Sequence, residues 1–291
     1  MLLYLVSLAA IVASCVLCVS IGTLLERDYT KYAPLPTTAD QASSLGFAPF
    51  SSHCELHLGV PYTQTGGKPD ESKPITLYFT RAGQVSGISV LYYDHIEKQQ
   101  PNLIDKGWIV PSGFGDGIYK VSVAFRNGSM ACSSKFDPDL PLGDNLIVNP
   151  DGIRQALPLT VRDAARNGWV RGSCILGMGV HWFRDLSSWG SMTWQASQLL
   201  PVVMMYDEVS DNPTMTVNAF FFASSVVQQS FVPPSANQWE PIPLPDRLMC
   251  GNLCNASCTF HGTDFYSTLH IYMNDRSRVT CRNNCTMACC N

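Results

Sequence analysis

The sequence predicts a mainly β protein of α+β type, with one or two short helices. We expect an antiparallel sheet or barrel-like core with a disulfide-rich C-terminal module. First, apolar and polar residues alternate in several segments with the two-residue period of strands. Second, charged residues make up only 14% of the 291 residues while Gly and Pro are frequent, which favours strands joined by ordered loops. Third, seven cysteines gather within residues 250–291.

The apolar N-terminal run predicts export. Residues 1–25 hold no charged side chain, and small residues precede a cleavage position near Ser20. Because the run is long and no basic residue precedes it, a membrane anchor formed by residues 1–25 is an alternative. A lipoprotein box at Cys15 is a weaker one. We expect a secreted chain divided into a signal peptide (1–20), a linker or leader (21–50), a β-rich domain (51–245) and a cysteine-rich C-terminal module packed on it (246–291).

Strands are expected wherever side chains alternate or apolar residues run continuously. The hairpin expected at residues 74–93 turns at Ala82–Gln84. The expected strands or hairpins span residues 53–60, 74–93, 117–125, 202–206, 215–223 and 266–273.

Two short helices are expected in the second half of the chain. Thr160 can cap a helix over residues 161–167, with Asp163 in its first turn. A second helix is expected over residues 193–200, where Pro201 would end it. Residues 232–245 hold five prolines, so we expect no regular structure there.

Cysteine number and spacing indicate disulfides. Removal of the signal would leave ten of the twelve cysteines, an even number in an exported chain. The terminal clusters would then pin the last strand to the body. A zinc site using His261 or His270 is the alternative, which an oxidising compartment disfavours. The cysteines expected in disulfides are Cys54, Cys132, Cys174, Cys250, Cys254, Cys258, Cys281, Cys285, Cys289 and Cys290.

Glycosylation signals support the same compartment. Sequons begin at Asn127, Asn255 and Asn284. We expect no stable membrane span after signal cleavage. The net charge of −4 provides no basic field for nucleic acid. Serine-hydrolase, zincin, phosphate-loop and dinucleotide-binding motifs are absent from the sequence, so no motif names a reaction.

The segment His53-Cys54-Glu55-Leu56-His57 is the first candidate site. On a strand, His53, Glu55 and His57 share a face, which suggests a metal or proton-handling site. Neighbours two apart lie roughly 6.6 Å apart and the outer histidines roughly 13 Å apart, too far to share one ion directly. A divalent metal would therefore need a further ligand such as His181, Asp94 or His95. A half-buried strand with a solvated outer face is the plainer interpretation.

The glycine-rich segment of residues 172–182 is the second candidate. Gly177 and Gly179 allow unusual backbone angles, and His181 with Trp182 places a polar group beside a large ring. We expect ligand binding by His181, Trp182, His53 and His57, with His53, Glu55, His57 and His181 as metal candidates. A tight turn with His181 bonded to a backbone carbonyl is the alternative.

The stretch Gly177-Met178-Gly179-Val180-His181-Trp182, with residues 201–206 and 218–223 after it, resembles a poorly characterised extracellular family. Its members carry a G-M-G-x-H-aromatic turn and an earlier H-x-x-x-H strand, matched here by His53 and His57. The resemblance covers the middle two-thirds of the chain and omits the cysteine tail. It implies a β-rich fold and a histidine pocket, and no reaction.

Three functions follow from these observations. The first is a secreted, disulfide-stabilised binding or interaction protein, with an extracellular ligand or protein partner. The second is a metal-dependent extracellular hydrolase that uses the same histidines. The third is a structural protein of the extracellular matrix.

Overall fold

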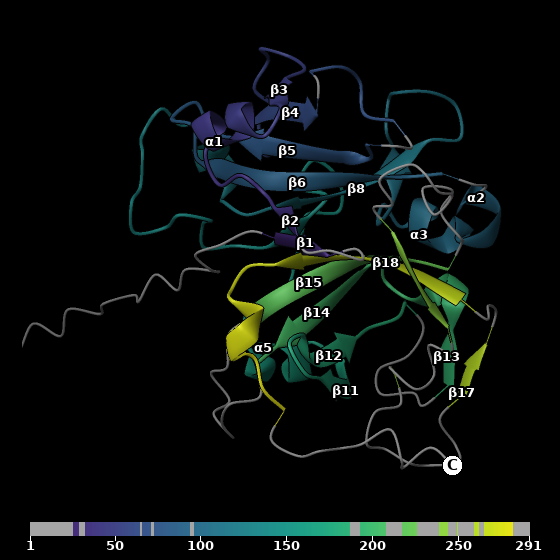
Figure 1. Ribbon diagram of the computed structural model, residues 1–291. Coiled ribbons are helices and arrows are strands. Elements are labelled where there is room, and N and C mark those ends of the chain that lie inside the picture. Colours follow the sequence, from purple (N-terminus) through teal and green to yellow (C-terminus); the bar gives the residue numbers. More distant parts are fainter. Residues whose placement is uncertain are drawn as a thin grey trace, which may run out of the picture.

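Two antiparallel sheets dominate the computed structural model and confirm the mainly β prediction. The structure describes residues 26–28, 33–64, 66–70, 73–93, 96–186, 193–207, 217–225, 239–243, 249, 259–261 and 265–281. Figure 1 shows the sheets stacked, one drawn mainly in blue and teal and the other mainly in green and yellow. We call them the first sheet and the second sheet.

The first sheet is a meander extended at both edges. Its strand order is β10-β9-β8-β6-β5-β4-β3, and β7 also pairs with β8. The strands are β3 (Phe47–Pro49), β4 (Val60–Gln64), β5 (Ile75–Phe79), β6 (Val85–Tyr92), β7 (Val110–Pro111), β8 (Tyr119–Ala124), β9 (Ile147–Val148) and β10 (Gln155–Ala156). The predicted hairpin of residues 74–93 is confirmed as β5 and β6.

The second sheet has the order β11-β12-β14-β15-β18-β1-β2, and β16 also pairs with β18. The predicted strands of residues 202–206, 215–223 and 266–273 are confirmed as β14, β15 and β18. The strands are β1 (Glu26–Asp28), β2 (Ala33–Pro34), β11 (Val170–Ile175), β12 (Gly179–Phe183), β14 (Val202–Tyr206), β15 (Val217–Ser224), β16 (Glu240–Pro243) and β18 (Phe265–Tyr272). A separate parallel ribbon joins β13 (Thr193–Gln195) and β17 (Thr259–His261).

The main core lies between the two sheets. Alternate side chains of each sheet face inward. Phe125, directly after β8, meets Phe220 of β15 with ring centroids 6.4 Å apart. The Tyr92 hydroxyl crosses the core and donates to the carbonyls of Pro201 and Ala223 at 3.4 and 3.3 Å. Each sheet therefore has an inner face in the core and an outer face turned away from it.

The helices are short. Thr160 caps α5 as predicted, because its Oγ1 accepts the N–H of Asp163 at 3.1 Å. The helices are α1 (Ala39–Ser44), α2 (Ile96–Gln99), α3 (Pro101–Asp105), α4 (Gly128–Ala131) and α5 (Val161–Arg166), with 3-10 turns η1 (Ala196–Gln198) and η3 (Arg276–Arg278).

Three local predictions were wrong. Residues 193–200 form β13 and η1 instead of an α-helix, because β13 pairs with β17. Residues 240–243 form β16 despite their prolines, which an edge strand tolerates. The segment expected as a linker or leader (21–50) is not free of regular structure, since α1 and β3 lie within it and β3 pairs with β4.

Candidate functional site

Residues 53–59 form a tight loop, which we call the clamp loop. The N–H of Glu55 donates to the carbonyl of Gly59 at 2.8 Å, and the N–H of Gly59 donates back at 2.9 Å. Gly59 has a φ of +118°, and a Cβ there would lie 2.6 Å from the Phe79 carbonyl oxygen. The predicted strand of residues 53–60 was therefore wrong: its alternation belongs to a loop, and β4 begins at Val60.

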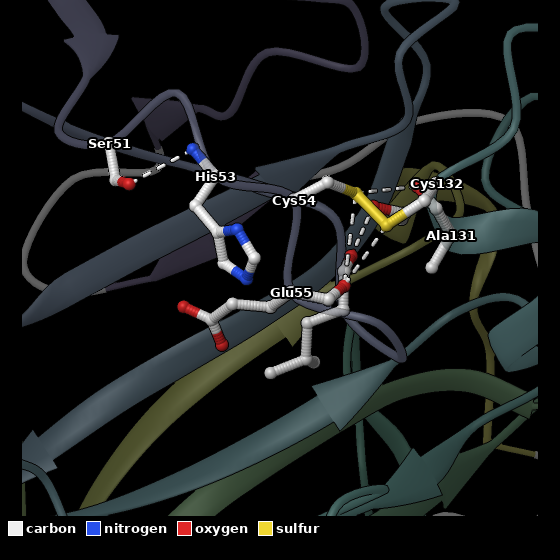
Figure 2. Close-up of a disulfide and its surroundings, with 8 residues drawn as sticks. Ser51, His53, Cys54, Glu55, Ala131 and Cys132 are labelled. Carbon is white, nitrogen blue, oxygen red and sulfur yellow. Dashed lines mark hydrogen bonds between the residues drawn. A yellow bond between two sulfur atoms is a disulfide. The ribbon is translucent and has the colours of Figure 1, made fainter.

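A disulfide fixes the clamp loop. Cys54 bonds to Cys132, directly after α4, with the two Cα atoms 5.9 Å apart. Figure 2 shows this bond beside the backbone carbonyl of Glu55, whose oxygen lies 3.4 Å from Sγ of Cys132. The Ser86 hydroxyl donates to the carbonyl of Leu58 from the sheet below. The loop is thereby held against the outer face of the first sheet.

Charged groups gather around the clamp loop. Nε2 of His57 lies 3.8 Å from Oδ1 of Asp151. The pKa of Glu55 is raised, mainly by burial and further by the negative charge of Asp151, while Lys120 and His53 act in the opposite direction. Figure 2 shows the His53 ring turned toward the Glu55 carboxylate. The loop therefore places a half-buried carboxyl among two histidines, a lysine and a second carboxyl.

A buried polar chain lies in the outer face of the first sheet. The Ser89 hydroxyl donates to the Tyr78 oxygen at 3.0 Å and shares a 2.7 Å hydrogen bond with the Ser122 hydroxyl. Burial raises the pKa of Tyr78, and the charge of Glu55 raises it further. The electrostatic coupling of Glu55 to Tyr78 connects the clamp loop to this chain.

His181 lies on the other sheet and is fully buried. It is on β12, and its side chain faces the outer side of the second sheet, with Nδ1 3.1 Å from the Ser173 carbonyl oxygen. Burial lowers the pKa of His181 to about 4, so the ring is neutral at physiological pH. Nε2 has no hydrogen-bond partner among the described residues. The Ser173 carbonyl is the kind of backbone partner that the tight-turn alternative expected for His181.

Trp182 points the opposite way. Its ring lies in the core, 6.2 Å from Tyr206 between centroids, and the residue is 7% exposed. Successive residues of a strand face opposite sides, so His181 and Trp182 do not line one pocket. The glycine turn before them has a packing reason: Gly179 has a φ of +96°, and a Cβ there would overlap the Tyr206 carbonyl.

The structure brings His53, Glu55 and His57 together but not with His181. The first three lie over the outer face of the first sheet, and His181 lies on the outer face of the second, across the core. Among the described residues, no group of three or more His, Cys, Asp or Glu could hold a metal ion. Asp94 and His95 lie outside the described residues.

Three residues around the clamp loop were not predicted from the sequence, and His270 was named only as a candidate zinc ligand. Asp151 and Lys120 surround Glu55, Gly128 packs on His57, and His270 lies near His181. No local pattern points to Asp151, which is 94 positions from His57 in the chain. The alternation of side chains in β18 predicts which residues lie on the same face as His270. It does not predict which strand pairs with β18, and so does not place His181 on that face.

The second described disulfide joins Cys174 of β11 to Cys281, after β18, with Cα atoms 5.9 Å apart. The bond ties Cys281, the last residue that the structure describes, to the second sheet, and both cysteines were expected in disulfides. The remaining predicted cysteines, Cys250, Cys254, Cys258, Cys285, Cys289 and Cys290, lie outside the described residues, as do Asn255 and Asn284. Asn127 is exposed, directly before α4.

Comparison with known proteins adds no relative. No protein-family model, curated protein or solved structure matches the chain. In the part of the chain that the structure describes, no helix combines the length and the apolar character needed to cross a membrane.

Proposed function

We propose that the protein is an extracellular binding protein that contacts a protein partner through the clamp loop. Leu56 carries this proposal, because it is 66% exposed at the tip of a loop closed by a disulfide and by the Glu55–Gly59 hydrogen bonds. A large apolar side chain on a constrained backbone buries area on binding while the backbone loses little conformational entropy. The two described disulfides are consistent with an oxidising, extracellular setting.

The residues beside Leu56 provide orientation. Glu55 and His57 precede and follow it, and Asp151 and Lys120 lie near the Glu55 carboxylate. Charges around an apolar anchor select a partner with complementary charges and exclude others. The partner we infer offers an apolar pocket for the Leu56 side chain, with mixed charge at the rim of that pocket.

Substitution of Leu56 by Asp tests the proposal. The matched control is Leu176→Asp, because Leu176 is also exposed, at 76%, but lies in the β11–β12 turn of the second sheet. The labelled full chain is applied to intact cells and to cell-free matrix of its source. We expect L56D to weaken binding at least about tenfold with unchanged melting temperature, as loss of a central anchor does. Equal effects of L56D and L176D, or no effect of either, would contradict the proposal; the latter result would favour a structural matrix protein.

A second function rests on Glu55. A half-buried carboxyl with a raised pKa beside a histidine is suited to donate a proton, as in acid-catalysed hydrolysis. It differs from the metal-dependent hydrolase expected from the sequence, because it uses neither a metal ion nor His181, which lies on the other sheet. The purified full chain and two variants are assayed against pooled glycoside and ester substrates. We expect turnover to be lost in Glu55→Gln and kept in L56D. Absence of turnover in the unaltered chain, with binding present, leaves the binding function alone.

A further inference from the structure

A glycosylation sequon lies beside the clamp loop, at the start of α4. Asn127 is exposed and its side chain makes no capping hydrogen bond, although its carbonyl accepts the N–H of Met130 at 2.8 Å. Ser129, which supplies the hydroxyl of the same sequon, is exposed as well. The two side chains that a glycosylating enzyme recognises are therefore both at the surface.

The residue between them attaches the sequon to the clamp loop. Gly128 is buried, and Nδ1 of His57 lies against it, so that a Cβ there would overlap the ring. Cys132, the residue after α4, forms the disulfide with Cys54. At the helical rise per residue, Asn127 is only about 7.5 Å from Cys132 along the axis of α4. A group on Asn127 is thus held close to the clamp loop by a packing contact and a covalent bond.

The His57 ring separates the sequon from Asp151. Its Nδ1 edge lies against Gly128, where this nitrogen is buried and has no hydrogen-bond partner among the described residues. Its Nε2, on the other edge of the ring, lies 3.8 Å from Oδ1 of Asp151, whose side chain is 56% exposed. Leu56 is the neighbour of His57 in the chain. The clamp loop therefore has the sequon on one side and an exposed carboxylate on the other.

We propose that Asn127 carries an N-linked glycan, which covers the α4 side of the clamp loop and leaves Leu56 open to a protein partner only from the Asp151 side. The direction of approach rests on the proposed binding function. A glycan is bulky and solvated, so a partner cannot pack closely where its stem lies. Asp151, one of the charges that the partner would recognise, belongs to the side that stays open.

The modification is a group transfer from a lipid-linked oligosaccharide. Nδ2 of Asn127 forms a bond to the anomeric carbon of the sugar and loses one proton to solvent. The bond from that carbon to the diphosphate of the lipid carrier breaks, and the lipid diphosphate leaves with the bonding electron pair. Because the enzyme and the lipid donor belong to the secretory route, the modification requires the export that the apolar N-terminal run predicts.

Mass spectrometry of the full chain tests the modification. The chain is made in cells of its source, and the peptide that holds Asn127 is measured before and after enzymatic release of N-linked glycans. Ser129→Ala removes the hydroxyl that the sequon needs, and the matched control Ser129→Thr keeps a sequon. We expect a glycan on Asn127 in the unaltered chain and in S129T, and none in S129A. An unmodified Asn127 in the unaltered chain overturns the proposal.

A polymer attached to either side of the clamp loop tests the direction of approach. An azide-bearing residue replaces Gly152, next to Asp151, in one protein and Met130 of α4 in a second. Gly152 accepts a side chain, since the nearest atom to a Cβ there lies at 3.6 Å. Binding of each protein to intact cells and cell-free matrix is measured before and after coupling to a polymer of glycan size. We expect the polymer at position 152 to weaken binding at least about tenfold, and the polymer at position 130, which the glycan already shields, to weaken it less than about twofold.

Equal effects of the polymer at the two positions, including no effect at either, overturn the shielding, as does a loss confined to position 130. Each protein is its own reference, so an effect of the substitution itself cancels from the comparison. If the unaltered chain binds neither cells nor matrix, the binding function fails and the shielding fails with it. The mass measurement still decides in that case whether Asn127 is modified.

Discussion

The His57 ring lies against the backbone of Gly128, so that a Cβ on Gly128 would overlap Nδ1 and lie 2.9 Å from Cε1. This contact joins the clamp loop to α4, whose last residue precedes Cys132. The clamp loop and α4 are therefore joined by the Cys54–Cys132 disulfide and by the packing of His57 on Gly128. Both restrict how the clamp loop can move.

Gly128→Ala tests that contact. We expect the free energy of unfolding to fall by about 1–3 kcal/mol, because the added methyl displaces the His57 ring. Gly152→Ala is the control, since the nearest atom to a Cβ there lies at 3.6 Å. Chemical denaturation gives both values. A double-mutant cycle with His57→Ala should recover most of the loss, and a loss in G128A that persists without the ring would show that the contact is not its cause.

Removal of the second disulfide should weaken the protein strongly. Cys174 and Cys281 are 107 positions apart, and the chain-entropy model gives about 4–5 kcal/mol for a bridge that closes a loop of this size. Urea denaturation of Cys174→Ser/Cys281→Ser measures the loss. A loss below about 1 kcal/mol would mean that the bridge adds little to the described pairing of β11 with β12.

Glu55 gives a pH dependence of opposite sign to that of the buried histidines. Its folded pKa is raised above 4.5, so the folded state holds the proton more tightly than the unfolded state. Stability contributed by Glu55 is therefore full below pH 4.5 and is lost as the pH rises through the folded pKa. We expect Glu55→Gln to stabilise the protein at pH 7, by less than about 1 kcal/mol because solvent screens the partly exposed group, and to have no effect at pH 4. Thermal unfolding of Glu55→Gln and of the unaltered chain at both pH values measures this difference. A lower melting temperature of Glu55→Gln at pH 7 would contradict the role given to Glu55.

The cap of α5 provides a local test. Thr160 Oγ1 accepts the Asp163 N–H at 3.1 Å and donates to the Asp163 carboxylate at 2.7 Å. Thr160→Ala should cost about 1 kcal/mol, and Thr160→Ser, which keeps the hydroxyl, should cost less. Equal losses in the two variants, measured by denaturation, would assign the effect to the lost methyl group of Thr160 instead of to the cap.

Much of the fold could be predicted from the sequence because its signals are local. The apolar runs of β14 and β15 and the cap at Thr160 each act within about ten residues. Alternation misled at residues 53–60, where the glycine at 59 turns the chain and the disulfide fixes the turn. A two-residue period describes side chains along a strand, and it cannot distinguish a strand from a short closed loop.

The candidate sites were predicted less completely, because they depend on contacts between distant segments. The sequence placed His53, Glu55 and His57 on a strand where the structure has a loop, and grouped them with His181, which the sandwich places on the other sheet. Asp151 approaches His57 only through the pairing of β8 with β9 and the loop after β9. Nothing in the local pattern around either residue specifies that approach.

Photo-cross-linking from the clamp loop tests the binding function most directly. A photoreactive side chain replaces Leu56 in one protein and Leu176 in a second, and each is irradiated on intact cells and cell-free matrix of the source. We predict a discrete adduct from position 56 that disappears when Cys54→Ser and Cys132→Ser release the clamp loop, and no matching adduct from position 176. An adduct formed only from position 176, or none from position 56, would contradict the account.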